Sequence, residues 1–219
     1  MTDALNLLTE NFGDFASGLW VTVRIVAVAF VIAMVVGTLV AALRVAPVKA
    51  LQRIGGVYVE VFRNIPLLVL LLILFIGVRR AGLPISAWVA GTMGLGLYTA
   101  AYIAEAIRSG VFAVGKGQIE AALSLGLTYP RAMRRIVLPQ AFRTVIPTLG
   151  SLIIAMIKNS AIVGASLLAL PDLLKESRVI QSETAQTEAF LWAAAGYLLV
   201  TVTVTVVFRR LETRYAVRR

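Results

Sequence analysis

GLWVTVRIVAVAFVIAMVVGTLVAAL, residues 18–43, is the stretch of sequence that decides the fold. Arg24 is its only charged residue, and all the others are apolar, small or uncharged. A bilayer core about 30 Å thick needs roughly 20 such residues in a helix, and a longer run crosses it with some tilt. The stretch therefore predicts a membrane-spanning helix.

The whole chain has the composition of a membrane protein. Of its 219 residues 59% are hydrophobic and only 15% are charged, with a mean hydropathy of +0.89, whereas soluble domains carry about 25% charge. It has no Cys and no His, which excludes disulfides, thiol chemistry, zinc sites and catalysis by a histidine base. The net charge of +10 would suit a nucleic-acid binder. No stacking aromatics alternate with the basic residues, so we expect no nucleic-acid partner.

Four more apolar runs follow the first, at about residues 57–78, 86–107, 144–168 and 189–208. Together the runs predict an all-α, polytopic membrane protein with about five transmembrane helices in a single domain over 1–219. The chain lacks a basic region ahead of the first run, so we expect no cleavable signal peptide and a retained first span. The interval 111–142 is too polar for hydrocarbon and predicts an extramembrane loop.

Basic residues gather on one side of this arrangement, thirteen against four. The thirteen are Arg44, Lys49, Arg53, Lys116, Arg131, Arg134, Arg135, Arg143, Arg209, Arg210, Arg214, Arg218 and Arg219, and the four are Arg79, Arg80, Lys175 and Arg178. Lys and Arg in short loops favour the cytoplasm. We therefore expect the N-terminus outside the cell, and the 111–142 loop and the C-terminus in the cytoplasm.

Within the polar interval, residues 116–127 read KGQIEAALSLGL and have the spacing of a short amphipathic helix. Ile119, Ala122, Leu123 and Gly126 recur at i, i+3, i+4 and i+7, which places them on one helix face. Pro130 follows at a point where such a helix would have to stop. These features fit a helix on the membrane surface as well as a docking element for another protein, and they leave both open.

The same interval carries a motif of fixed spacing: EAA at 120–122, Gly126 after three residues, Ile136 after nine more, and then Leu138-Pro139. This motif resembles that of the membrane subunits of binding-protein-dependent ABC importers. The resemblance extends over most of the chain and is closest to the polar amino-acid branch, similar to actinobacterial glutamate importer permeases. The resemblance also rests on five further segments: RNIPLL at 63–68, AYIAE at 101–105, GQIEAA at 117–122, LPQAFR at 138–143 and KNS at 158–160.

The resemblance implies a type I ABC importer permease fold in a bacterial cell membrane, and uptake of a polar amino acid, glutamate or a related one. It implies that the loop holds a coupling helix that docks on an ABC ATPase subunit. The residues it assigns to this contact are Gly117, Gln118, Glu120, Ala121, Ala122, Gly126, Ile136, Leu138 and Pro139.

The same resemblance implies a set of partners. The chain itself is expected to be no enzyme and to bind no cofactor, since ATP and Mg would belong to a dimer of ATPase subunits. Residues 110–117 (GVFAVGKG) resemble a phosphate-binding loop but lack its Ser or Thr, so they do not predict a nucleotide site in this chain. The other implied partners are a second permease (the same chain or a homologue), an extracellular or periplasmic amino-acid-binding protein and membrane lipid.

An ion-driven secondary amino-acid carrier is the alternative function. Such a carrier works without an ATPase and is typically built from inverted repeats with broken helices at the membrane midplane. The sequence gives no sign of either feature.

Polar residues within the predicted spans are candidates for the substrate pathway: Arg63, Asn64, Glu105, Arg108, Lys158, Asn159 and Ser160. Glu105 and Arg108 are three residues apart on one helix face, close enough for an ion pair. Charges inside a membrane mark either a pathway or a structural pair, and both interpretations of Glu105 stay open. Lys158 either lines the outer vestibule or extends its ammonium group to the interface.

Overall fold

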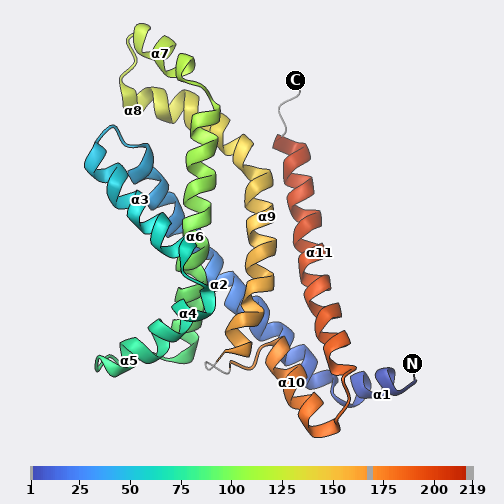
Figure 1. Ribbon diagram of the computed structural model, residues 1–219. Coiled ribbons are helices and arrows are strands. Elements are labelled where there is room, and N and C mark those ends of the chain that lie inside the picture. Colours follow the sequence, from blue (N-terminus) through green and yellow to red (C-terminus); the bar gives the residue numbers. More distant parts are fainter. Residues whose placement is uncertain (1, 167–169, 216–219) are drawn as a thin grey trace.

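The computed structural model describes residues 2–166 and 170–215, and this part of the chain is helical without a strand (Figure 1). The predicted all-α class is confirmed. In chain order the elements are α1 (Thr2–Glu10), α2 (Phe12–Val45), α3 (Lys49–Asn64), α4 (Leu67–Leu72), the π-helical turn η1 (Ile73–Gly77), α5 (Val78–Arg80), α6 (Ala87–Ala113), α7 (Lys116–Ser124), α8 (Tyr129–Ala132), the π-helical turn η2 (Met133–Val137), α9 (Leu138–Ala165), α10 (Leu173–Thr184) and α11 (Ala189–Tyr215).

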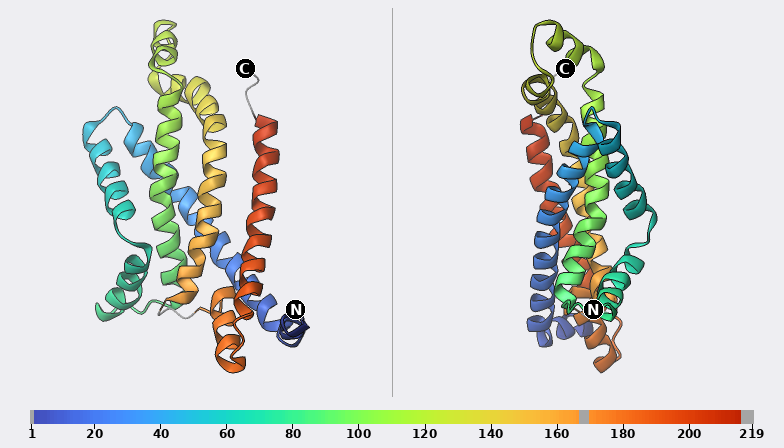
Figure 2. Two further views of the ribbon diagram at one scale, coloured as in Figure 1. Left: turned by 45° about the vertical axis from the view of Figure 1, so that its right-hand side comes forward. Right: turned by 90° about the vertical axis from the view of Figure 1, so that its left-hand side faces the viewer.

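Four long helices form the body of the protein. α2 crosses it at a tilt, α6 packs against both α2 and α9, and α11 runs beside α9 (Figures 1 and 2). Ile25 of α2, Leu95 of α6 and Ile157 of α9 are fully buried in one apolar cluster. The core therefore lies between helices, and α6 is its central element.

Small residues let α2 and α6 approach closely. A methyl group at Gly96 would lie 2.8 Å from Cβ of Ile32 and 3.1 Å from the carbonyl oxygen of Ala29. Such contacts drive association in lipid, where burial of apolar surface does not. The same composition lowers the hydropathy of α6. Among the described residues, three helices are long and apolar enough to span a membrane unaided, Phe12–Val45, Tyr129–Ala165 and Ala189–Arg214, and α6 is not one of them.

The second predicted span, 57–78, is not one continuous helix. The chain instead forms α3 and α4, and the helical segments on either side of the break meet at 104°. The cause is Pro66, whose ring disfavours helical backbone at the preceding residue, and Ile65 accordingly has φ −90° and ψ 130°. Counted as one bent span, this pair raises the number of candidate spans in the described chain to four. With α6, each of the five predicted segments corresponds to a helix or a helix pair.

The interval 111–142 is more helical than predicted. α6 continues to Ala113, and helical backbone resumes at Tyr129 and runs on to Ala165. Pro130 lies in the first turn of α8, where a proline is tolerated, so it begins a helix rather than ending one. Pro139 follows the wider turn η2, a local adjustment of the kind that accommodates proline in membrane helices. The fourth predicted span, 144–168, lies within the later part of this helical stretch up to Ala165, and its last two residues lie outside the described part of the chain.

The two ends of the protein carry different elements. α7 and α8 lie at one end together with the last described turns of α11, and α1 and α10 lie at the other (Figures 1 and 2). The two ends of the four-helix body can therefore be considered separately.

Candidate functional site

Residues 116–139 contain the positions to which the family resemblance assigns ATPase coupling, and we call them the coupling segment for that reason alone. Its first helix, α7, projects beyond the end of α6 (Figure 1). Within it, Gly117, Gln118, Glu120 and Ala121 are exposed, whereas Ala122 is buried. Ile119 packs with Val111 of α6 and Val137 of η2. One face of α7 thus rests on the chain itself, and the face bearing Glu120 and Ala121 is open to solvent.

Gly126 has a physical role in this segment, which explains its fixed distance from the EAA residues. It follows the end of α7 with φ +80°, a left-handed conformation that residues with a side chain adopt at a cost. The N–H of Leu127 donates to the carbonyl of Ala122 (3.1 Å) and the N–H of Gly126 to that of Leu123 (2.9 Å). This pair of bonds is the Schellman motif that closes a helix, and it leaves Leu125 83% exposed at the tip.

The end of the motif joins the coupling segment to the rest of the fold. Ile136 is half-buried and Val137 fully buried, while Leu138 and Pro139 are exposed at the start of α9. The hydroxyl of Tyr129 donates to the carbonyl of Val45, the last residue of α2, over 3.3 Å. The segment is therefore attached to α2 as well as to its neighbours in sequence.

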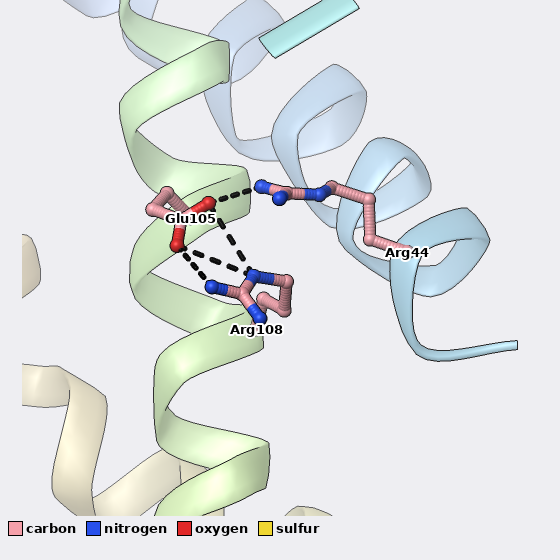
Figure 3. A network of polar contacts seen from close by, with 3 residues as sticks. All are labelled: Arg44, Glu105 and Arg108. Atoms are coloured by element: carbon pink, nitrogen blue, oxygen red, sulfur yellow. Dashed lines mark hydrogen bonds and ion pairs between the residues drawn. The ribbon is translucent and has the colours of Figure 1, made fainter. Parts of the chain in front are cut away.

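Glu105 of α6 lies in an ionic cluster with two arginines (Figure 3). Nη2 of Arg108 donates to its Oε1 over 2.5 Å, which is the contact that the spacing of three residues predicts. Nη1 of Arg44, from the last turn of α2, donates to its Oε2. The pairing of Arg44 with Glu105 could not be predicted from the sequence, because the two residues are 61 positions apart and no local periodicity connects them.

Two adjoining pockets run beside α6, and we call them together the α6 groove. The first has a volume of about 480 Å³ and the second of about 250 Å³. Tyr102 lines both, its hydroxyl lies 3.1 Å from that of Tyr98, and the guanidinium of Arg63 lies over its ring at 5.2 Å. The first pocket is lined by Arg44, Val59, Glu60, Arg63, Asn64, Tyr102 and Glu105, and the second by Tyr98, Thr99, Tyr102, Leu152, Ala155, Met156 and Asn159.

Four of the seven pathway candidates therefore gather in one groove: Arg63, Asn64, Glu105 and Asn159. Arg108 lines a neighbouring pocket of about 430 Å³ nearer the end of α6. Lys158 is exposed and lines neither pocket of the groove, and the fully buried hydroxyl of Ser160 donates to the carbonyl of Ile157 (2.7 Å). The KNS stretch thus presents only its middle residue to the groove. Tyr98 and Tyr102 are groove residues that the sequence analysis did not single out.

A second polar cluster lies at the opposite end, around Asp172. Its side chain is fully buried and caps α10, with Oδ1 accepting from the N–H of Lys175 (2.9 Å). Oδ2 accepts from the hydroxyl of Tyr197 (3.0 Å) of α11, and the N–H of Leu173 donates to Oγ1 of Thr22 (3.1 Å) of α2. Asp172 lies in the connection between α9 and α10, outside the spans, and burial raises its pKa to about 6. The cluster joins three helices, and within residues 2–166 and 170–215 no cation forms an ion pair with the carboxylate.

Apolar helices beside a groove that carries charged and polar side chains, with a projecting segment at one end, are features expected of a membrane transport subunit. Sequence comparison is specific about the class. Residues 33–217 match the family described as "Binding-protein-dependent transport system inner membrane component", and the chain belongs to that family.

Two relatives and one solved structure cover nearly the whole chain. It is 39% identical over 211 residues to "Probable glutamine ABC transporter permease protein GlnM" of Bacillus subtilis, covering 96% of this chain and 97% of the relative. It is 34% identical over 212 residues to "Glutamate transport system permease protein GluC" of Corynebacterium efficiens, covering 91% and 93%. A structure described as "Crystal structure of an amino acid ABC transporter with histidines" matches with a TM-score of 0.87 and 36% identity, covering 94% and 96%. The family resemblance seen in the sequence is thereby confirmed.

Proposed function

We propose that this chain is the permease subunit of an ABC importer that takes up a polar amino acid, glutamate or a close relative such as glutamine. The observation that carries the proposal is the agreement between the family match and the α6 groove, where four pathway candidates from three helices meet. Relatives whose names state glutamine or glutamate transport support the amino-acid class.

The chemistry of the groove suits a zwitterionic cargo. Arg63 offers a guanidinium to a carboxylate, and Glu60 offers a carboxylate to an ammonium group. Asn64, Asn159 and the two tyrosine hydroxyls add neutral hydrogen-bonding groups of the kind that recognise a polar side chain. Within this proposal Glu105 and Arg108 belong to the inner end of the pathway, and Lys158 and Ser160 are peripheral to it.

The coupling segment is the proposed docking site for an ABC ATPase. Glu120, Ala121 and the tip residue Leu125 are exposed on the side of α7 that does not pack on the chain. Ile136, Leu138 and Pro139 would hold the segment in place at the start of α9. ATP and Mg would bind to the ATPase dimer, leaving this chain without a cofactor and without catalytic activity of its own.

The remaining partners and the orientation follow from the same proposal. The groove is open on one side, so a second permease, the same chain or a homologue, would complete the pathway, and a binding protein would deliver the amino acid from outside. The coupling segment and the end of α11 lie at the same end of the helices, opposite α1 (Figure 1). This supports a cytoplasmic coupling segment and C-terminus with the N-terminus outside, in agreement with the distribution of basic residues.

The ion-driven carrier gains no support from these findings. The bend at Pro66 is a broken helix of the kind that carriers contain. The family match, however, is to a transport system that depends on a binding protein. The carrier therefore remains only as an outcome of the test.

The decisive experiment is to co-express the chain with the ATPase, permease and binding-protein subunits encoded beside it and to reconstitute the complex in liposomes. Glutamate, glutamine, aspartate and a basic amino acid are then compared for their stimulation of ATP hydrolysis and for uptake. We expect a polar amino acid to stimulate both. Uptake that needs an ion gradient and no ATPase would overturn the proposal.

A further inference from the structure

The inner end of α2 is where the coupling segment meets the α6 groove. The carbonyl of Val45 accepts a hydrogen bond from the hydroxyl of Tyr129 (3.3 Å). The side chain of Val45 packs in the same apolar cluster as Ile119 of α7 and Met133 of η2. One polar and one apolar contact therefore attach the last turn of α2 to the segment that would receive the ATPase.

Arg44, the residue before Val45, extends from this turn toward α6. Its side chain is only 18% exposed and forms an ion pair with Glu105 (Figure 3). α3 packs directly on its stem, because a methyl group at Gly55 would lie 2.7 Å from Cγ of Arg44. Enclosure between two helices limits the rotamers of this side chain, so its guanidinium moves with the end of α2.

Arg108 already satisfies the carboxylate of Glu105 within α6, through bonds from Nε and Nη2. A carboxylate inside a transmembrane helix needs one cation to offset the cost of burial, and α6 supplies that cation itself. The pairing with Arg44 adds a contact to a second helix that the charge balance of Glu105 does not require. Its structural effect is to join α2 to the groove wall.

We infer that Arg44 is a positioning residue that links the coupling segment to the α6 groove. Movement of the coupling segment displaces the end of α2 through Val45, and Arg44 transfers that displacement to Glu105, which lines the groove. The inference rests on the proposed transport function and deepens it. It gives Arg44, a residue outside the EAA motif, a role in converting ATP hydrolysis into a change in the shape of the pathway.

The test uses the complete transporter in liposomes and measures two quantities: amino acid taken up per ATP hydrolysed, and the concentration of loaded binding protein that half-maximally stimulates hydrolysis. For Arg44→Gln we expect uptake per ATP to fall about fivefold or more, the lower range of allosteric coupling. The half-maximal concentration should stay unchanged, because Arg44 acts through Glu105 and not on delivery. Arg44→Lys, which keeps the charge, should recover part of the ratio.

Arg53→Gln is the matched control, since it removes the same charge from an exposed position on α3.

A second set of variants distinguishes loss of the link between α2 and α6 from simple loss of a charge. Tyr129→Phe removes only the hydrogen bond to Val45 and should lower the ratio by about twofold, as expected for one neutral bond. The double variant Arg44→Gln with Glu105→Gln should lower uptake per ATP no more than the more severe of the two single changes does.

Several results would overturn the inference. One is a normal ratio for Arg44→Gln, and another is an equal loss for Arg53→Gln. If the complex with Arg44→Gln does not assemble, the complexes with Arg44→Lys and Tyr129→Phe are measured instead. Normal uptake per ATP in both of them would refute the link. These outcomes are distinct from failure of the proposed function, in which the unaltered complex itself would show no amino-acid-stimulated hydrolysis and uptake.

Discussion

The polar clusters at the two ends of the helix bundle are built on opposite principles. Glu105, with 27% of its side chain exposed, is held by two guanidinium groups and borders a groove. Asp172 is fully buried, its oxygens accept from a tyrosine hydroxyl and a backbone N–H, and it has no ion pair in the described part of the chain. A partly exposed ion pair contributes little to the free energy of unfolding, whereas a buried hydrogen-bonded carboxylate is costly to leave without its partners. We therefore expect changes at Glu105 to affect transport more than stability, and changes at the Asp172 cluster, which we call the Asp172 joint, to affect stability.

Glu105→Gln is expected to have the largest effect, and on transport rather than on stability. The neutral amide leaves both Arg44 and Arg108 without a countercharge at the groove, so we expect uptake in liposomes to fall about tenfold. Because the cluster is partly exposed, the loss of unfolding free energy should be no more than about 1 kcal/mol. Glu183→Gln, a change at an exposed position of α10, is the control. Unchanged uptake would mean that the pair is only structural.

Asp172→Ala should instead reduce stability. The change removes the cap of α10 and leaves the hydroxyl of Tyr197 without its acceptor, which we expect to cost about 2 kcal/mol of unfolding free energy. Thermal unfolding of the purified complex in detergent measures it, with Glu183→Ala on the same helix as control. Asp172→Asn should lose less, because its amide oxygen can still cap the helix. Equal unfolding temperatures for the Asp172→Ala and Glu183→Ala complexes would contradict this role of the Asp172 joint.

The stability of the Asp172 joint should also depend on pH. Burial raises the pKa of Asp172 from 3.8 to about 6 in the folded state. The folded state therefore binds its proton more tightly, and the stabilisation present below the unfolded pKa is lost as pH rises through about 6. As pH rises from 5 to 7, we expect the unfolding free energy of the unaltered protein to fall by about 1 kcal/mol relative to that of Asp172→Asn. Parallel unfolding curves of the two proteins across this range would refute the assignment.

The smallest expected effect concerns the coupling segment. Gly126→Ala forces a side chain into a left-handed conformation, a strain of about 1 kcal/mol. We expect several-fold weaker association of the ATPase, measured by co-purification at increasing salt. Gly13→Ala is the control, because that glycine is helical and open space surrounds the added methyl group. Equal retention of the ATPase by both variants would show that the tip geometry is irrelevant to docking.

Local sequence explains a good part of the site. The EAA stretch is helical as its periodicity predicts, Gly126 ends that helix for a backbone reason, and Glu105 meets Arg108 three residues away. The break at Pro66 also had a local signal, since proline restricts the residue before it. The residues on both sides of Pro66 are mostly apolar, however, and therefore favoured the prediction of one uninterrupted span. Hydropathy alone likewise underrates α6, whose small residues are suited to packing against other helices.

The sequence by itself determined that this is a polytopic helical membrane protein, which family it belongs to, that the EAA stretch is helical, and which charges pair within one helix. These properties depend on neighbours within a few residues, or on composition and spacing. The end of the EAA helix was predicted too late, because the sequence placed Gly126 on the helix face, whereas α7 ends at Ser124. Only the tertiary structure decided that Arg44 reaches Glu105, that Asn159 and Arg63 face one groove, and that Asp172 is buried beneath Tyr197. Contacts between helices depend on how each helix is tilted and rotated against the others, and that geometry is set by packing of the whole bundle.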